Sequence, residues 1–182
     1  MKQNQRADHS AEAYSDDVRS SAASHVPNHD NAVPYPEPNA NQSNEMRLEV
    51  FIADDSIGIR SRLIEMLMEN KSIHLIGESG DAEAAVIALR TLKPDVVILD
   101  VHMPKGEGMR VLQEIKMTDP DRIAIIFTAF PYPEYRRAYL AAGADYFFDK
   151  TQDFQKMVDV LATLAEKHFT GRNDNEKRSD TS

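Results

Sequence analysis

The chain has 182 residues, a formal net charge of -9 and no cysteine. The lack of cysteine excludes a disulfide framework and thiolate metal sites, and the negative charge argues against nucleic acid as a direct partner. The N-terminus from Met1 to Arg6 lacks the apolar stretch of a signal peptide, and no apolar run is long enough to span a bilayer. We therefore expect a cytoplasmic protein that does not contact a membrane.

Composition divides the chain into three parts. Residues 1–45 are rich in Ser, Asn, Ala, Asp and Pro and contain no Leu, Ile or Phe. Such a segment cannot bury enough apolar surface to offset the entropy of ordering, so we expect a disordered leader. We also expect disorder in the polar tail, residues 171–182, which is too short to fold alone. Residues 46–170 have the length of one ordinary domain.

Hydrophobic periodicity predicts alternating strands and helices along this domain. A strand at 47–53 is followed by a helix capped by Ser56, and residues 73–78 have the weak alternation of an edge strand. Asp81 is the expected N-cap of a helix that runs to Leu92. The remaining predicted elements are, in order, a strand at 95–99, a helix at 107–118, a strand at 122–127, a helix at 133–142, a strand at 145–149 and a closing helix from about residue 154.

Five strands alternating with five helices predict an α/β fold. Continuous apolar runs suit strands that are buried on both faces of a parallel sheet, and right-handed crossovers place helices on both sides. We predict a flavodoxin-like, doubly wound five-stranded parallel sheet with the strand order 2-1-3-4-5. Its switch point then lies between the first and third strands, where ligands bind in open α/β sheets.

Polar residues follow four of the predicted strands at the point where each apolar run ends. Asp54 and Asp55 follow the first strand and Asp100 the third, while Thr128 and Lys150 stand at the ends of the fourth and fifth. The carboxyl ends of parallel strands share one edge of the sheet, so these residues are expected to meet there.

Three clustered carboxylates repel one another strongly. Two unit charges about 4 Å apart cost roughly 4 kcal/mol at an effective dielectric constant near 20. A cation or a raised pKa must offset this repulsion. Oxygen ligands without His or Cys suit Mg2+, with Mn2+ as a possible substitute, and Lys150 adds a fixed positive charge.

The same residues lie in motifs that resemble the receiver domain of two-component response regulators. The resemblance extends over about residues 46–169 and rests on the order and spacing of several modest motifs. These motifs are Ile52-Ala53-Asp54-Asp55-Ser56, the run from Pro94 to Pro104 with Gly108 beyond it, Phe127-Thr128-Ala129, and the run from Ala141 to Lys150.

The resemblance implies a role for each acidic residue. Asp100 corresponds to the residue that accepts a phosphoryl group from a histidine kinase or phosphotransfer protein. Asp54, Asp55 and Asp100 would bind Mg2+ together with the backbone carbonyl of His102. The protein would then mainly position and neutralise the phosphoryl group, with Lys150 stabilising its charge.

The resemblance also implies a switch. The hydroxyl of Thr128 would donate to the aspartyl phosphate, and Phe147 occupies the position of an aromatic residue whose rotamer reports the position of Thr128. A core role for Phe147 remains the alternative. His102 and Phe130 are expected to flank the path of the attacking water, and because Phe130 is bulky and apolar we predict slow self-dephosphorylation.

Two features depart from the family pattern. The residue after the lysine is usually a proline joined by a cis bond, whereas this chain has Thr151. A non-proline cis bond costs about 2.5–4 kcal/mol, so Thr151 is interpreted instead as a cap of the final helix. Pro131 and Pro133 stiffen the loop after Thr128, which normally rearranges on phosphorylation.

We expect a stand-alone receiver that is not an enzyme beyond its own phosphorylation and dephosphorylation. It would signal in trans, by binding a target protein or by passing the phosphoryl group onward, as a monomer or a phosphorylation-dependent dimer. The fourth helix, last strand and last helix are the expected docking face, including Tyr135, Tyr139 and Phe147.

Two other functions stay open. The first is a small Mg-dependent phosphatase of the haloacid-dehalogenase type, which also uses a strand-end Asp, a Thr and a Lys. Those enzymes carry an Asp two residues after the nucleophile, where this chain has His102. The second is a phosphorylation-independent adaptor, which the Thr151 departure leaves possible.

Overall fold

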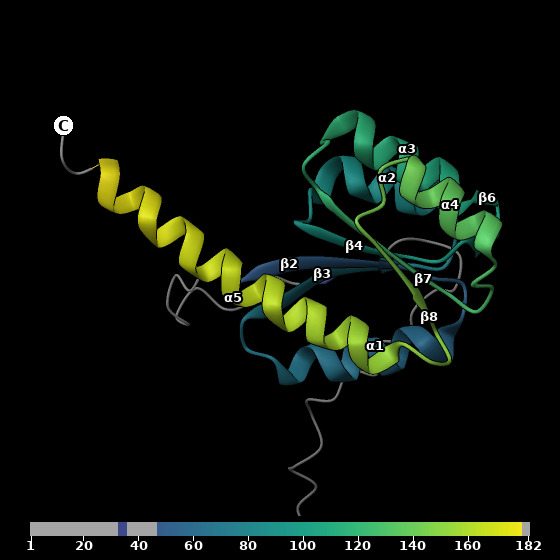
Figure 1. The fold of residues 1–182 in the computed structure, drawn as a ribbon, viewed down its shortest axis with the longest axis horizontal. Helices are drawn as coiled ribbons and strands as arrows, with labels where there is room; N and C mark the ends of the chain where they lie inside the picture. The colour runs from purple at the N-terminus through teal and green to yellow at the C-terminus, as the bar shows by residue number, and fades with distance from the viewer. Residues whose placement is uncertain (1–32, 36–46, 180–182) are drawn as a thin grey trace, which may run out of the picture.

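A computed structural model describes residues 33–35 and 47–179 of the chain. Its centre is a six-stranded sheet with helices on both faces (Figure 1). The strands of this sheet are β1 (Val33–Pro34), β2 (Leu48–Ala53), β3 (Ile73–Ser79), β4 (Val96–Leu99), β7 (Ile123–Thr128) and β8 (Tyr146–Asp149). Two short strands, β5 (His102–Met103) and β6 (Gly106–Glu107), pair as a separate antiparallel hairpin.

The strand order is β1-β3-β2-β4-β7-β8. Strands β3, β2, β4, β7 and β8 are mutually parallel, and their order is the predicted 2-1-3-4-5. The flavodoxin-like fold is therefore confirmed. The sheet differs from the predicted five-stranded one at its outer side, where a sixth strand, β1, pairs antiparallel with β3.

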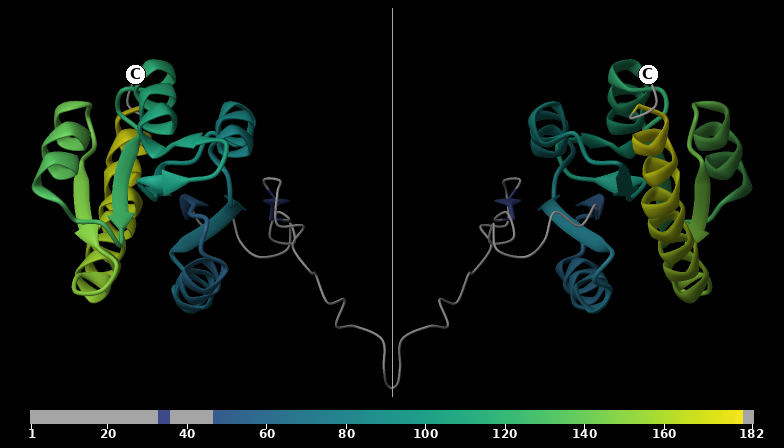
Figure 2. Two further views of the ribbon diagram at one scale, coloured as in Figure 1. Left: turned by 90° about the vertical axis from the view of Figure 1, so that its right-hand side faces the viewer. Right: turned by 90° about the vertical axis from the view of Figure 1, so that its left-hand side faces the viewer.

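Five helices cover the sheet, as predicted. They are α1 (Ile57–Glu69), α2 (Ala82–Leu92), α3 (Gly108–Thr118), α4 (Pro133–Ala141) and α5 (Phe154–Ser179). Figure 2 shows α1 and α5 on one face and α2, α3 and α4 on the other. Ser56 and Asp81 cap α1 and α2 as expected, because their side chains accept hydrogen bonds from the backbone N–H groups of Ile59 and Ala84.

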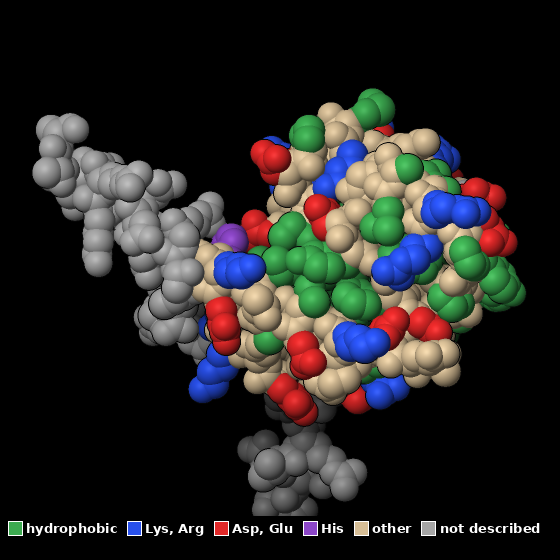
Figure 3. Space-filling view, in the orientation of Figure 1, with side chains coloured by type: hydrophobic (Ala, Val, Ile, Leu, Met, Phe, Trp, Pro, Cys, Tyr) green, Lys and Arg blue, Asp and Glu red, His purple; other side chains and the backbone are tan. Residues whose placement is uncertain are grey.

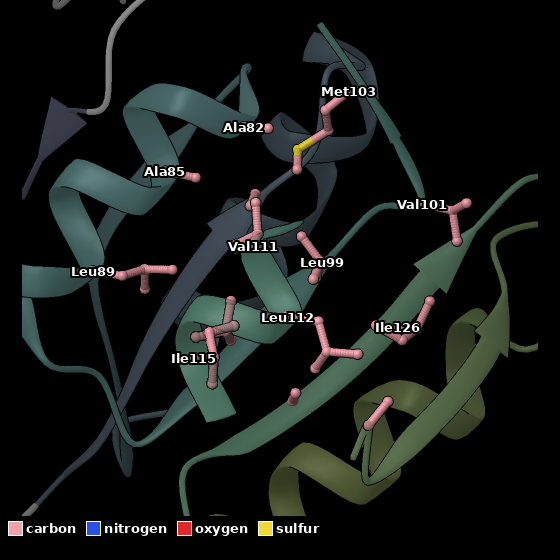
Figure 4. Close-up of a cluster of buried hydrophobic side chains, with 14 of the residues drawn as sticks. Ala82, Ala85, Leu89, Leu99, Val101, Met103, Val111, Leu112, Ile115 and Ile126 are labelled. Atoms are coloured by element: carbon pink, nitrogen blue, oxygen red, sulfur yellow. The ribbon is translucent and has the colours of Figure 1, made fainter. Parts of the chain in front are cut away.

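The two faces of the sheet bury separate hydrophobic clusters. On one face, α2 and α3 pack against β4 and β7 through the apolar side chains drawn in Figure 4, among them Leu89, Leu99, Leu112 and Ile126. On the other face, residues of α1 and α5 pack against β2 and β7. This two-sided burial explains why the strands are apolar along their whole length.

The structure differs from the predicted disorder at both ends of the chain. The expected disordered leader contains β1, because Val33 and Pro34 pair with Glu78 and Gly77 and cover the edge of β3 that was expected to be free. Residues 1–32 and 36–46 lie outside the described residues, so disorder there stays a prediction. At the other end α5 runs to Ser179, farther than expected, since no proline interrupts its backbone hydrogen bonds after residue 171.

The turn before α5 also differs from expectation. No cis peptide bond occurs within the described residues, so Lys150 and Thr151 are joined in trans. The backbone N–H of Thr151 donates to Oδ1 of Asp149 at 2.7 Å, and Asp153 stands directly before α5 with its carbonyl accepting from the N–H of Met157. Thr151 therefore belongs to the preceding turn and does not cap the helix. No helix among the described residues is long and apolar enough to cross a membrane.

Candidate functional site

Four parallel strands end at one edge of the sheet with the polar residues that the sequence singled out. Asp54 and Asp55 follow β2, Asp100 follows β4, Thr128 is the last residue of β7, and Lys150 follows β8. The strands are parallel, so their carboxyl ends lie together at the same end of the sheet. The structure therefore gathers residues that are nearly a hundred positions apart in the chain.

The ammonium group of Lys150 lies between two carboxylates. Its Nζ is 2.7 Å from Oδ2 of Asp54 and 2.7 Å from Oδ2 of Asp100, and at most 7% of any of the three side chains is exposed. Burial by itself would lower the pKa of Lys150, but the charges of Asp54 and Asp100 outweigh it and raise the pKa. Lys150 is therefore held as a cation that offsets the repulsion between the two acids.

Hydrogen bonds hold the backbone N–H and one carboxylate oxygen of Asp54. Its N–H donates to the carbonyl of Ser79 at 3.0 Å, and its Oδ1 accepts from the N–H of Ser56 at 2.9 Å. Its buried Oδ2 accepts no well-oriented hydrogen bond but lies 2.7 Å from the ammonium nitrogen of Lys150. Burial raises the pKa of Asp54 to about 6, although Lys150 opposes this rise.

Asp100 is also held by hydrogen bonds at its backbone N–H and at one carboxylate oxygen. Its N–H donates to the carbonyl of Ala53 at 2.8 Å, and its Oδ1 accepts from the N–H of Val101 at 2.6 Å. Gly108 packs against the backbone of Asp100, because a Cβ at Gly108 would lie 2.1 Å from the Asp100 carbonyl oxygen. Only glycine permits this approach, which accounts for the glycine at the start of α3.

The three carboxylates form a group that fits a hard divalent cation. Asp54, Asp55 and Asp100 each offer one oxygen, and these oxygens lie within 4.8 Å of one another. Asp55 is exposed and the other two are buried, so the group opens to solvent on one side. Oxygen donors alone match the ligand preference of Mg2+, and one of them, Oδ2 of Asp54, is already paired with a cation, the ammonium group of Lys150. The exposed side chain of His102 is not a member of this group.

Thr128 and Phe147 lie near these residues but make other contacts. The hydroxyl of Thr128 is fully buried and accepts from the N–H of Phe130 at 3.2 Å. The ring of Phe147 is also buried and lies 6.4 Å from the ring of Tyr139, centroid to centroid. Arg136 of α4 donates to the carbonyl of Phe147 at 3.0 Å. The ring of Phe147 is therefore on the inner side of β8.

The burial of two aromatic residues changes the predicted docking face. Tyr139 and Phe147 are only 3% and 4% exposed, and the Tyr139 hydroxyl donates to the carbonyl of Val101. They cannot contact a partner directly in this conformation, because both side chains are buried. Tyr135, which is half-buried, is the remaining accessible member of the predicted set.

A cluster of four rings lies beside the carboxylates, where sequence analysis placed His102 and Phe130. The ring centroids of His102 and Phe130 are 4.7 Å apart, and Tyr135 packs edge-on against His102 at 5.4 Å. Tyr132 extends the cluster from the same loop. Phe130 and Tyr132 remain 43% and 51% exposed, so the cluster is part of the surface.

A buried ion pair that was not predicted from the sequence contacts the backbone of Asp54. Nε of Arg60 in α1 lies 3.1 Å from Oε2 of Glu78 in β3, and each side chain is 5% exposed. Nη1 of Arg60 also donates to the backbone carbonyl of Asp54 at 2.5 Å. A charged residue in a helix is ordinarily exposed, so no pattern in the sequence distinguishes Arg60 from its charged neighbours.

Comparison with known proteins gives one consistent result. Residues 50–162 match the family described as the response regulator receiver domain. A protein-glutamate methylesterase/protein-glutamine glutaminase of Idiomarina loihiensis is 32% identical over 126 residues, which cover 67% of this chain and 32% of that protein. The DNA-binding transcriptional activator DevR/DosR of Mycobacterium tuberculosis is 29% identical over 97 residues, which cover 53% of this chain and 45% of that protein. The chain thus spans less than half of each of these relatives.

Solved structures agree with the family match. The response regulator domain of Thermotoga maritima CheB has a TM-score of 0.60 at 22% identity, over 68% of this chain and 97% of that domain, which shows the shared fold. A chain in the CheX-CheY-BeF3-Mg+2 complex of Borrelia burgdorferi has a TM-score of 0.55 at 27% identity, over 63% of this chain and 89% of that chain.

Proposed function

Because the chain belongs to the response regulator receiver domain family, we propose that it accepts a phosphoryl group on Asp100 from a histidine kinase or phosphotransfer protein. The observation that carries this proposal is the contact of Lys150 Nζ with both Asp54 and Asp100 at 2.7 Å. A cation held between a nucleophilic carboxylate and a second acid is the arrangement that phosphoryl transfer needs for charge stabilisation.

The transfer step exchanges one bond to phosphorus for another. A carboxylate oxygen of Asp100 forms the new P–O bond while the P–N bond to the donor imidazole breaks, and the imidazole leaves after taking a proton from solvent. Lys150 balances negative charge on the phosphoryl oxygens, and the hydrogen bond from the N–H of Val101 orients the Asp100 carboxylate. The protein contributes position and electrostatics to this step.

Asp54, Asp55 and Asp100, with the backbone carbonyl of His102, are the residues we propose for binding Mg2+. Their carboxylate oxygens lie close enough together to share one ion, and Oδ2 of Asp54 lacks a well-oriented hydrogen bond. When bound, Mg2+ supplies positive charge that neutralises the transferring phosphoryl group. Mn2+ has similar ligand preferences and is expected to substitute.

Thr128 and Phe147 are the proposed switch. The buried hydroxyl of Thr128 now bonds to the loop at Phe130, and it would exchange this partner for an oxygen of the phosphorylated Asp100. Such a movement would change the packing around the ring of Phe147, which now lies buried against Tyr139 of α4. Two discrete arrangements of this kind are the basis of switching in packed cores.

The proposed output is binding to another protein, or onward phosphotransfer, as a monomer or a phosphorylation-dependent dimer. The similar CheX-CheY complex supports this idea, since it joins a receiver-like chain to a separate protein. On the face in Figure 3, hydrophobic side chains gather beside α5 among charged groups, which is a typical feature of protein interaction surfaces. The net charge of -9 favours such a partner over nucleic acid. We propose no catalysis beyond the domain's own phosphorylation and dephosphorylation, and a cytoplasmic location.

Labelling with acetyl phosphate tests the proposal directly. We expect the full chain to gain one phosphoryl group in the presence of Mg2+, measured by intact mass, and to gain none with EDTA. Asp100→Asn should abolish labelling, whereas the matched control Asp121→Asn, an exposed aspartate, should label like the parent. Absence of labelling in the parent would contradict the proposal and favour a phosphorylation-independent adaptor. Turnover of a generic phosphate ester would instead indicate a phosphatase.

A further inference from the structure

We propose that the N-terminal residues Val33–Tyr35 help position Asp54 for its cation, acting through Glu78 and Arg60. This inference rests on the function proposed above, and it assigns a positioning role to residues far from Asp100. One chain of contacts runs from β1 through Glu78 and Arg60 to Asp54.

The first link is the docking of β1 on β3. Val33 pairs with Glu78 and Pro34 with Gly77, and the N–H of Tyr35 donates to the carbonyl of Ile76 at 3.0 Å. Tyr35 is half-buried and packs against the hydrophobic cluster beneath the sheet. This segment therefore has a defined register on β3, near the carboxyl end of that strand.

The second link joins Tyr35 to Glu78. The Tyr35 hydroxyl donates to Oε1 of Glu78 at 3.4 Å, while Oε2 of Glu78 accepts from Nε of Arg60 at 3.1 Å. Burial, followed by the charge of Glu78, raises the pKa of Tyr35 to about 12, so the hydroxyl stays protonated and able to donate. Glu78 thus uses one oxygen for each partner.

The third link joins Arg60 to Asp54. Nη1 of Arg60 donates to the Asp54 carbonyl, which belongs to the peptide unit that joins Asp54 to Asp55. Holding this planar unit restrains the backbone from which both carboxylates extend. Ser79 and Ser56 already hold the N–H and Oδ1 of Asp54, so Arg60 holds the remaining backbone group, and Oδ2 faces the ammonium group of Lys150 in the acidic group.

The burial of the ion pair is consistent with a positioning role. A buried ion pair is often no more stabilising than apolar residues of the same volume, because desolvation offsets the Coulombic gain. Stability alone therefore gives little reason for Arg60 and Glu78 to lie at 4% exposure. Hydrogen bonds that orient metal ligands, by contrast, commonly change metal affinity by 10- to 100-fold.

The test measures Mg2+ affinity of the full chain by titration calorimetry. We expect Arg60→Lys, which keeps the charge but loses the second N–H donor, to weaken Mg2+ binding by about tenfold. Tyr35→Phe removes only a hydroxyl with a long hydrogen bond, so we expect about a threefold loss. In the Arg60→Lys background, Tyr35→Phe should have no further effect, because both act through the same link.

Two controls separate positioning from stability. Tyr146→Phe makes the same chemical change on β8, at the opposite edge of the sheet, and should leave Mg2+ affinity unchanged. Ile73→Val removes a buried methyl group at the start of β3, away from the carboxyl ends, and should lower the melting temperature without changing Mg2+ affinity. Acetyl phosphate labelling of Tyr35→Phe should slow at low Mg2+ and recover at saturating Mg2+.

Failure of this inference can be told apart from failure of the proposed function. If the parent binds Mg2+ and labels on Asp100 while Tyr35→Phe has the affinity of the parent, the inference is overturned. An additive loss in the double variant would also overturn the route through Arg60. A parent that neither binds Mg2+ nor labels would instead refute the proposed function.

Discussion

The carboxylate of Asp54 is deeply buried, with one oxygen hydrogen-bonded to the N–H of Ser56 and the other paired with Lys150. Burial is the main cause that raises its pKa from 3.8 to about 6. In the unfolded chain Asp54 ionises near its ordinary pKa, so the folded state binds more protons between about pH 4 and pH 6. The free energy of unfolding should therefore fall as the pH rises through this range.

Asp54→Asn should remove this pH dependence. The difference between a pKa of about 6 and the ordinary 3.8 corresponds to about 3 kcal/mol, so we expect stability at pH 7 without divalent cations to increase by up to this amount. Urea denaturation at a series of pH values measures the effect. Asp55→Asn removes the same charge from an exposed position and should change stability by less. An unchanged pH profile in Asp54→Asn would contradict the prediction.

Gly108 allows a second prediction about a single residue. Its missing side chain lets α3 begin against the carbonyl of Asp100, so Gly108→Ala should destabilise the fold by about 1–3 kcal/mol and slow labelling of Asp100. Gly58→Ala is the matched control, because nothing lies within 4 Å of its added Cβ. That change within α1 should stabilise the chain by about 0.5–1 kcal/mol. Equal effects of the two variants on stability would refute the packing argument.

The loop between β7 and α4 carries exposed aromatic side chains. Its Phe130 and Tyr132 join His102 and Tyr135 in the surface cluster of rings beside the proposed phosphorylation site. The ring of Phe130, which is expected to flank the path of the attacking water, provides no group to orient or activate that water. We therefore expect a phosphorylated chain that loses its phosphate slowly.

Phe130→Glu should accelerate the loss of phosphate by roughly tenfold, because a carboxylate can orient or deprotonate the attacking water. The decay of phosphorylated chain is measured after removal of acetyl phosphate. Tyr132→Glu makes a similar change in the same loop but at a residue that packs against Phe130 and Tyr135 and not against His102, and it should have a smaller effect. Equal decay rates of Phe130→Glu and the parent would reject this explanation.

For the whole molecule, the acidic group links cation binding to stability. A ligand that binds only the folded state adds about 1.4 kcal/mol to the free energy of unfolding at ten times its dissociation constant. We expect this gain for Mg2+ at pH 7 and its loss on chelation with EDTA. The gain should shrink below about pH 6, where Asp54 is protonated. Thermal unfolding of the parent and Asp54→Asn measures the effect, and an equal response to Mg2+ in both would exclude Asp54 as a ligand.

Much of this architecture could be predicted from local signals. Buried apolar runs and their spacing predicted the five parallel strands and the end of the sheet where Asp54, Asp100 and Lys150 meet, and the flavodoxin-like fold that this alternation predicts gave the strand order. Caps such as Ser56 and Asp81 marked the helix starts to within a residue. These predictions succeed because strand burial and helix capping depend on residues that are close together in the chain.

Other features were decided only by tertiary contacts. Val33–Pro34 lies in a segment too polar to fold alone, and it forms a strand only because β3 presents an open edge. Arg60 and Glu78 look like ordinary charged residues until α1 and β3 bring them together, and the burial of Tyr139 and Phe147 depends on where α4 packs. The sequence by itself thus determined the sheet and the residues at its edge, since strand periodicity is local. The partners that hold those residues were decided by packing between distant segments, which local patterns do not record.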